Sequence, residues 1–127
     1  MDLARIRNEF HTARQQFPSI ELAQTSIGNP YVRIAVRTST GGIYVASIYF
    51  SNAYPNENPK VIVDTPKIVS SSPHMYTNGS ICYMLPSLWN PGKHNLLFVI
   101  ARTSKWLNKY EVWKSTLRWP GAGIAHS

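Results

Sequence analysis

The stretch that decides the fold is residues 31–50, which read YVRIAVRTSTGGIYVASIYF. Residues 31–37 alternate in character, and residues 43–50 are rich in β-branched and aromatic side chains, so both segments are predicted to be strands. The Thr-Gly-Gly triplet at 40–42 gives the backbone between them the freedom that a tight turn requires. Residues 31–50 therefore predict an antiparallel β-hairpin.

Two further strands are predicted on either side of this hairpin. Residues 60–64, KVIVD, have three β-branched residues at their centre and lie between Pro59 and Pro66. A weaker strand is expected over Glu21–Ser26. Together the four segments predict an antiparallel meander.

The start of the chain predicts an amphipathic helix. Its apolar side chains recur at spacings of three and four residues: Leu3, Ile6, Phe10, Ala13 and Phe17. Asp2 is a candidate N-cap, and Pro18 helps to end the helix. The outer face is a basic strip, consisting of Arg5, Arg7, His11 and Arg14. Such a strip is either an ordinary solvated face or a docking surface for a partner.

After the fourth strand, residues 65–93 show no sustained periodicity and are punctuated by proline and glycine. A loop of this length inside a compact domain is often functional. A second helix is expected over Leu96–Tyr110, with Asn95 as its cap. A stripe at helical spacing is expected to be core; it consists of Trp106, Tyr110, Trp113 and Leu117. The predicted fold class is α+β.

Length and composition indicate one domain, residues 1–127. The 13 Lys and Arg against 6 Asp and Glu give a formal charge of +7, and 43% of the residues are hydrophobic. A nucleic-acid-binding role is weakly supported, because only 15% of residues are charged and the cations are scattered. No membrane-spanning stretch and no secretory signal are recognised, so we expect a cytoplasmic protein with neither a nucleic acid nor a membrane as its partner.

The only cysteine, Cys82, excludes an internal disulfide and a multi-cysteine zinc site. A lone intracellular cysteine is most often a small buried hydrophobic residue. However, the Asn-Gly pair at 78–79 can form a sharp turn and hold the residues after it in an extended, partly exposed stretch. A thiol placed there can meet a substrate. The four histidines and this cysteine form no recognised metal-ligand spacing, so we expect neither a metal nor a cofactor.

At this point the sequence resembles the ubiquitin-conjugating enzymes, which receive the C-terminus of a ubiquitin-like protein as a thioester and pass it to an amine. The resemblance spans most of the chain. It rests on the basic first helix, the meander, the segment 54–59, the NGSIC signature at 78–82, and Trp89 followed by Pro91. It implies a UBC-like fold with an N-terminal helix, a four-stranded antiparallel meander, a long active-site loop and C-terminal helices. It also implies that Cys82 is the thioester-forming catalytic nucleophile.

One departure from the family concerns the triplet upstream of the cysteine. Most members carry His-Pro-Asn, and the matching positions here are Ser72, Pro73 and His74. Its asparagine is linked to ordering the loop or to stabilising the oxyanion formed during aminolysis. The imidazole of His74 can donate to an oxyanion as an amide does, and it can also take a proton from the attacking amine near neutral pH. A catalytic role and a merely loop-ordering role both remain open for His74.

The tryptophan-rich ending resembles bacterial single-domain relatives from antiphage operons, particularly those that accompany the nucleotidyltransferases of cyclic-oligonucleotide signalling (CBASS). This resemblance implies that the acyl group comes from the C-terminus of a CD-NTase, that is, a cGAS-like nucleotidyltransferase, or of a ubiquitin-like protein. Whether a separate activating enzyme takes part is left open. Glu111 and His126 are further polar residues of interest, although a helix surface and a solvated terminus explain them equally simply. His11 and His94 are expected to be surface or capping residues.

The competing interpretation is a non-catalytic binding module on the same fold. Retention of Cys82 in its signature argues against this alternative, and the altered triplet at 72–74 argues mildly for it. Trp89 is expected to be a packing anchor for the loop, because large aromatic side chains contribute most through buried area.

Overall fold

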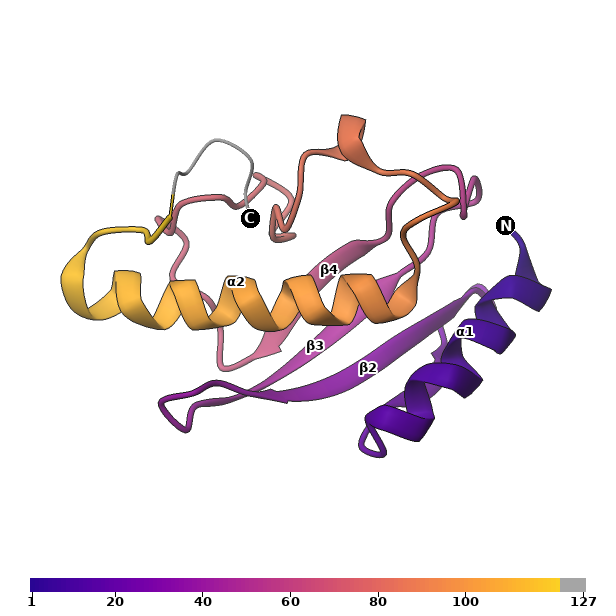
Figure 1. The fold of residues 1–127 in the computed structure, drawn as a ribbon, viewed down its shortest axis with the longest axis horizontal. Helices are drawn as coiled ribbons and strands as arrows, with labels where there is room; N and C mark the ends of the chain where they lie inside the picture. The colour runs from indigo at the N-terminus through magenta and orange to yellow at the C-terminus, as the bar shows by residue number, and fades with distance from the viewer. Residues whose placement is uncertain (122–127) are drawn as a thin grey trace.

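The structure of the protein, a computed structural model, is described here for residues 1–121 (Figure 1). Two α-helices and four strands make up the fold, together with a short 3₁₀ turn. In chain order the elements are α1 (Leu3–Gln16), β1 (Glu21–Gln24), β2 (Pro30–Arg37), β3 (Ile43–Tyr49), β4 (Lys60–Thr65), the 3₁₀ turn Pro86–Leu88, and α2 (Leu96–Thr116).

The sheet is a four-stranded antiparallel meander in the order β1-β2-β3-β4, as predicted. Ile34 of β2 lies opposite Ala46 of β3, which in turn lies opposite Val63 of β4. The predicted hairpin is confirmed, and Gly41 in its turn has a φ of +93°. β1 ends at Gln24, short of the predicted end at Ser26, because the chain already turns there.

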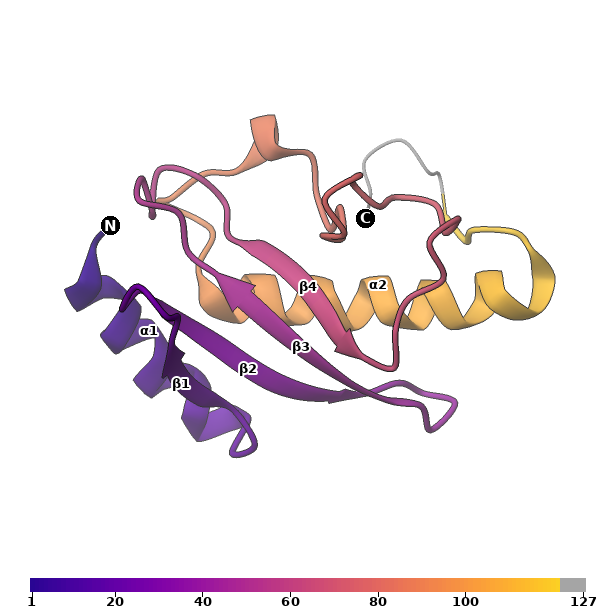
Figure 2. The same ribbon diagram turned by 180° about the vertical axis from the view of Figure 1, so that it is seen from behind.

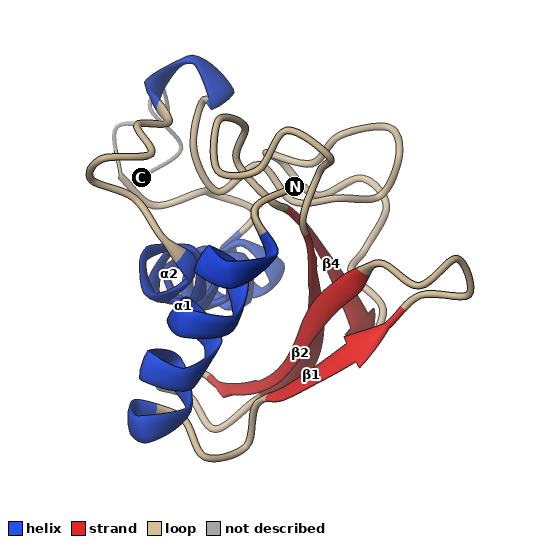
Figure 3. Cartoon of the chain, turned by 90° about the vertical axis from the view of Figure 1, so that its right-hand side faces the viewer, coloured by secondary structure: helices blue, strands red, loops and turns tan. Residues whose placement is uncertain are grey.

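Both helices cover the same face of the sheet, and the opposite face is left open (Figures 2 and 3). The strand alternation explains this arrangement, because every second residue of β2 is buried toward the helices: Val32, Ile34 and Val36. From α1 the fully buried side chains are Ile6 and Ala13, and from α2 they include Leu96 and Val99. The core therefore lies between one sheet face and two helices.

The predicted first helix is confirmed, with the Asp2 carboxylate accepting a hydrogen bond from the Arg5 amide at 3.0 Å. Of the four residues of the basic strip, three lie on the outer face as expected and Arg5 does not. The guanidinium of Arg5 turns toward the beginning of α2 and donates to the carbonyl oxygens of Pro91 and His94 at 2.8 and 2.9 Å. Arg5 is thus a structural residue, while Arg7, His11 and Arg14 remain exposed.

The C-terminal helical region is one long helix in the described residues, and it continues to Thr116 instead of ending near Tyr110. The Asn95 cap is confirmed by a 3.0 Å hydrogen bond from the Phe98 amide. Of the aromatic stripe, Trp106 and Tyr110 are buried as expected, and Trp113 is half-buried. Leu117 is 76% exposed, because it ends the helix in a left-handed conformation with a φ of +60° and points away from the core.

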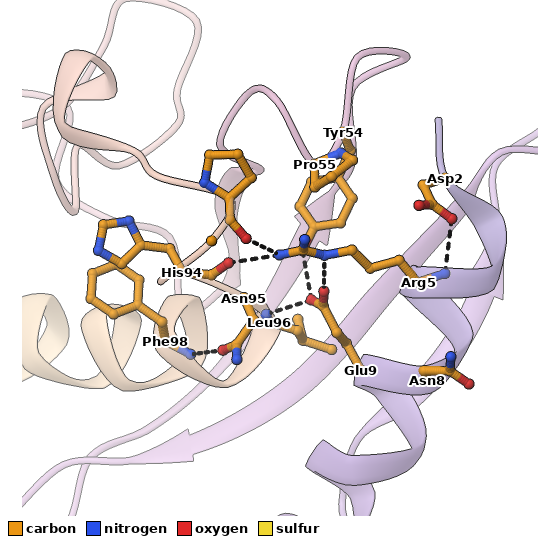
Figure 4. Close-up of polar contacts among 12 residues, drawn as sticks. Asp2, Arg5, Asn8, Glu9, Tyr54, Pro55, His94, Asn95, Leu96 and Phe98 are labelled. Atoms are coloured by element: carbon orange, nitrogen blue, oxygen red, sulfur yellow. Dashed lines mark hydrogen bonds and ion pairs between the residues drawn. The ribbon is translucent and has the colours of Figure 1, made fainter.

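The two helices are joined by a network centred on the Glu9 carboxylate (Figure 4). One carboxylate oxygen accepts from the Tyr54 hydroxyl at 2.6 Å and from the first amide of α2, that of Leu96, at 2.8 Å. The other accepts from Nε of Arg5 at 2.5 Å. A carboxylate at a helix N-terminus also interacts favourably with the helix dipole. Glu9 therefore fixes where α2 begins relative to α1.

The same network shifts the pKa of two of its members. Burial would lower the pKa of Arg5, but the hydrogen bond and the charge of Glu9 outweigh it, so that this pKa is raised. Burial, together with the hydrogen bond and charge of Glu9, raises the pKa of the Tyr54 phenol well above its ordinary value. Arg5 is therefore charged and Tyr54 neutral over the whole physiological range.

Within residues 1–121, no helix combines the length and apolar character needed to cross a membrane.

We predict that Glu9→Ala lowers the free energy of unfolding by about 2 to 3 kcal/mol, because it leaves the Arg5 guanidinium and the Tyr54 hydroxyl without their acceptor. Urea denaturation followed by tryptophan fluorescence measures this change. Glu21→Ala, at an exposed carboxylate on β1, is the matched control and should change stability by less than about 0.5 kcal/mol. Equal stabilities of the two variants would show that the network contributes little.

Candidate active site

The candidate site is a short hairpin formed by residues 74–82. Met75 and Ile81 form an antiparallel bridge, and the Cys82 amide donates to the carbonyl oxygen of His74 at 2.8 Å. The Ile81 amide donates to the carbonyl oxygen of Val61 at 2.9 Å, which ties this hairpin to the outer edge of β4. The position of Cys82 is therefore determined by the sheet.

The tip of the hairpin is the turn that the Asn-Gly pair predicts. Gly79 has a φ of +90°, a conformation that glycine adopts without a steric penalty. The turn is closed by hydrogen bonds between Tyr76 and Ser80 at 2.9 Å and between Gly79 and Tyr76 at 3.0 Å. The Asn78 side chain accepts from the Ser80 amide at 2.9 Å. The predicted turn is confirmed.

Cys82 itself differs from the expectation, because its side chain is not exposed. The residue is 5% accessible. Its sulfur lies 3.0 Å from the Tyr76 hydroxyl and 3.4 Å from the Met84 carbonyl oxygen. The prediction of a partly exposed thiol is wrong, because the sulfur lies against the Tyr76 hydroxyl and the Met84 carbonyl oxygen, contacts that the turn signal does not contain.

Tyr76, whose hydroxyl contacts the Cys82 sulfur, nevertheless lies at the surface. Tyr76 is 42% exposed. A groove of about 270 Å³ runs beside it, and both Tyr76 and Met84, the two partners of the sulfur, line this groove together with Asn58, Lys60 and Asn78.

His74 contacts Cys82 through its main chain. It has a φ of +56°, and its carbonyl oxygen accepts both from the Cys82 amide and from Nε1 of Trp106 at 3.1 Å. The His74 ring packs against Trp119, with 4.9 Å between the ring centroids. The structure therefore brings the two predicted site residues together, and the atom of His74 that contacts Cys82 is a backbone oxygen.

Ser72, which holds the first position of the altered triplet, is a buried loop residue. It is 7% exposed, and its hydroxyl lies 3.1 Å from the sulfur of Met75. Its amide donates to the carbonyl oxygen of Val69 at 3.0 Å. These contacts order the approach of the chain to the hairpin.

Trp89 and His94 order the segment between Cys82 and α2. Trp89 is 9% exposed, and its Nε1 donates to the carbonyl oxygen of Pro55 at 2.7 Å, as expected for a packing anchor. His94 accepts from the Asn90 amide at 2.9 Å and stacks on Phe98 at 4.1 Å. Burial, then the charges of Arg102 and Lys93, lower the pKa of His94. Its role in the loop matches the expected capping role.

Of the other polar residues of interest, Glu111 is the one that the structure describes. Glu111 faces the turn between β2 and β3, where it accepts from the Thr38 hydroxyl at 3.4 Å and pairs with Lys114 at 3.8 Å. It is therefore a link between α2 and the sheet. His126 lies outside the described residues. Residues 1–121 contain no group of three or more His, Cys, Asp or Glu side chains that could hold a metal ion.

Tyr76 is the residue that the sequence analysis did not single out. The only signal for it was its place six residues before the cysteine, at the start of the turn. A tyrosine at that position is equally consistent with an exposed turn residue, so the contact with the sulfur emerges only from the folded hairpin.

A family model described as "Type II CBASS E2 protein" matches residues 9–127. The search of curated proteins finds no match.

Several solved structures share the fold. The UEV domain of Vps23, in a complex with ubiquitin, has a TM-score of 0.58 at 17% identity, covering 80% of this chain and 79% of that one. A putative ubiquitin-conjugating enzyme from Trypanosoma cruzi has a TM-score of 0.57 at 23% identity, covering 83% and 76%. The ubiquitin-conjugating enzyme UbcA1 from Agrocybe aegerita has a TM-score of 0.54 at 21% identity, covering 98% and 96%. At these identities the likeness concerns the fold, and it confirms the predicted UBC-like architecture.

We predict that at pH 10, where a thiol is ionised with or without a hydrogen-bond donor, Tyr76→Ala increases the rate at which iodoacetamide alkylates Cys82 at least tenfold, because the variant removes a side chain that contacts the sulfur. Mass spectrometry of the quenched protein measures the rate. Thr77→Ala, the neighbouring exposed turn position, is the matched control and should react like the wild type. If Tyr76→Ala reacted no faster than the control, the sulfur would be shielded by the rest of the loop.

Proposed function

The chain belongs to the family of type II CBASS E2 proteins, and from this premise we propose that it carries the C-terminus of a partner protein as a thioester on Cys82 and transfers it to an amine. Family and fold together support a ubiquitin-conjugating-like role in CBASS, which is antiphage defence. The thioester, the identity of the partner and action as one domain over residues 1–127 belong to the proposal.

The observation that carries this proposal is the position of the Cys82 sulfur. It lies at the end of a hairpin strand that is hydrogen-bonded to the sheet edge, 3.0 Å from the hydroxyl of the exposed Tyr76. A strand that is anchored to the sheet in this way can hold a nucleophile in place. The groove beside Tyr76 offers space for the extended tail of a partner.

The proposed chemistry has two steps. In the first, the Cys82 thiolate attacks the carbonyl carbon of an activated C-terminus, a new C–S bond forms, and the bond to the previous leaving group breaks. In the second, an amine attacks the same carbon, a C–N bond forms, and the electron pair of the C–S bond returns to the sulfur. Because the first step exchanges one thioester for another when the donor is a thioester, its free-energy change is small. The second step depends on positioning the amine and on stabilising the oxyanion.

Two kinds of partner fit this proposal. The carried C-terminus belongs either to a CD-NTase, that is, a cGAS-like nucleotidyltransferase, or to a ubiquitin-like protein. The first is favoured by the CBASS family match, since such operons are accompanied by nucleotidyltransferases. A cytoplasmic location is part of the same proposal, and whether a separate activating enzyme takes part is left open.

We predict that wild-type protein, mixed with a CD-NTase and any activating enzyme, forms an adduct that thiol reagents cleave. Cys82→Ala should form no adduct, and Cys82→Ser should form either an ester that resists thiols or none. Non-reducing electrophoresis with and without dithiothreitol measures this. An adduct that survives in Cys82→Ala would place the reactive group elsewhere.

His74 is assigned a role in the second step. Its carbonyl oxygen orders the loop in any variant, because the backbone is unchanged, so side-chain substitutions isolate the imidazole. The imidazole is proposed to donate to the tetrahedral oxyanion or to take the proton of the amine.

We predict that His74→Ala slows aminolysis about a hundredfold while thioester formation changes little. His74→Asn is the matched variant, because asparagine tolerates the left-handed conformation and supplies an amide donor. It should retain most of the aminolysis rate. Single-turnover assays that follow loading and discharge separately measure both steps, and equal discharge rates in all three proteins would reduce His74 to a structural residue.

A second candidate function is that of a binding module that holds a partner without forming a thioester. The low exposure of Cys82 favours it, and the UBC-like fold also occurs in the UEV domain that was solved with ubiquitin. The Cys82→Ala experiment separates the two functions. A binding module would still capture its partner and would form no thiol-sensitive adduct in the wild type.

A further inference from the structure

Which group donates the hydrogen bond between Tyr76 and Cys82 depends on where the thiol hydrogen lies. A thiol carries a single hydrogen, and a hydrogen bond from the sulfur to the Met84 carbonyl oxygen, 3.4 Å away, uses this hydrogen because a carbonyl oxygen can only accept. The sulfur lone pairs are then left for the Tyr76 hydroxyl at 3.0 Å. Within the described residues, the sulfur is the hydrogen-bond partner of that hydroxyl. With the thiol hydrogen used for Met84, the phenol is the donor and the sulfur the acceptor.

The phenol remains protonated under all physiological conditions. Burial, the hydrogen bond to Cys82 and the charge of Cys82 raise the pKa of Tyr76 to about 12. A neutral phenol that points at the sulfur stabilises the thiolate more than the thiol, because hydrogen bonds to a charged acceptor are the stronger ones.

We propose that Tyr76 is a catalytic residue that donates a hydrogen bond to the Cys82 sulfur whenever the sulfur carries negative charge. This inference rests on the proposed function and deepens it. The charge develops on the sulfur twice, first as the attacking thiolate and later as the leaving group of aminolysis. The same side chain thus covers the sulfur at rest and stabilises it during the reaction.

The role is limited to hydrogen bonding. In aminolysis the C–N bond forms, the C–S bond breaks, and the electron pair of the latter becomes the sulfur lone pair toward which the Tyr76 O–H points. The proton lost by the amine goes to solvent or to the His74 imidazole. Tyr76 keeps its own proton throughout, so the step needs no additional reactant.

Shielding the sulfur requires the ring of Tyr76, whereas donating a hydrogen bond to it requires the hydroxyl. Tyr76→Phe preserves the ring that shields the sulfur and removes only the hydroxyl. If Tyr76 is only a cover, this variant behaves like the wild type at every pH. If the hydroxyl stabilises the thiolate, the loss is confined to the pH range in which the thiol is not yet ionised.

The test is the rate of Cys82 alkylation by iodoacetamide from pH 6 to pH 10, each protein being compared with its own rate at the highest pH. In Tyr76→Phe we expect the profile to move about one unit toward higher pH, which lowers the relative rate at pH 7 about tenfold. Tyr49→Phe, on the open face of the sheet, is the matched control and should retain the wild-type profile. A thermal melt of each variant establishes that it is folded.

Superimposable profiles of Tyr76→Phe and wild type would overturn the proposal. As a second measurement, protein that contains 3-fluorotyrosine, whose phenol is a stronger donor, should show a profile moved toward lower pH; an unchanged profile there would also count against it. The assay needs no partner protein. A missing thioester adduct would therefore refute the proposed function and leave this result intact, whereas a normal adduct with superimposable profiles would refute only the role of Tyr76.

Discussion

The carboxylate of Glu9 is the constraint on which the rest of the structure depends. It binds Arg5 in its own helix, the Tyr54 hydroxyl, and the first amide of α2, and so determines where α2 starts. The helix then reaches the candidate site with two side chains. Trp106 donates to the His74 carbonyl oxygen, and the Tyr110 hydroxyl accepts from the amide of Val69 at 2.9 Å. A charge at the N-terminal helix thus helps to order a loop that begins more than fifty residues later.

Most of the fold is predictable because it is encoded locally. Strand alternation in residues 31–37, the glycines of the turns, and the caps Asp2 and Asn95 each act within a few residues, and all were identified correctly. The errors have a different origin. Arg5 turns inward because a carboxylate and two carbonyl oxygens lie there, and Leu117 is exposed because the helix ends in a left-handed residue. Both depend on contacts or conformations that periodicity does not report.

The candidate site shows the same division. The turn at residues 76–79 follows from its residue types, whereas the burial of Cys82 depends on where one aromatic side chain lies in three dimensions. The altered triplet illustrates a further limit of sequence reasoning. The atom of His74 that holds Cys82 is a carbonyl oxygen, which every residue type has. A side-chain comparison at that position therefore misses the contact that orders the loop.

The bond between the Ile81 amide and the Val61 carbonyl oxygen has a consequence for molecular recognition. It occupies the free margin of β4 at the level of the nucleophile, so that an incoming peptide cannot extend the sheet by strand addition there. Pairing of a peptide main chain with the sheet edge, which depends little on the peptide's sequence, therefore cannot occur beside Cys82. In the proposed transfer, selectivity for the partner's tail at this margin would therefore come from contacts with its side chains.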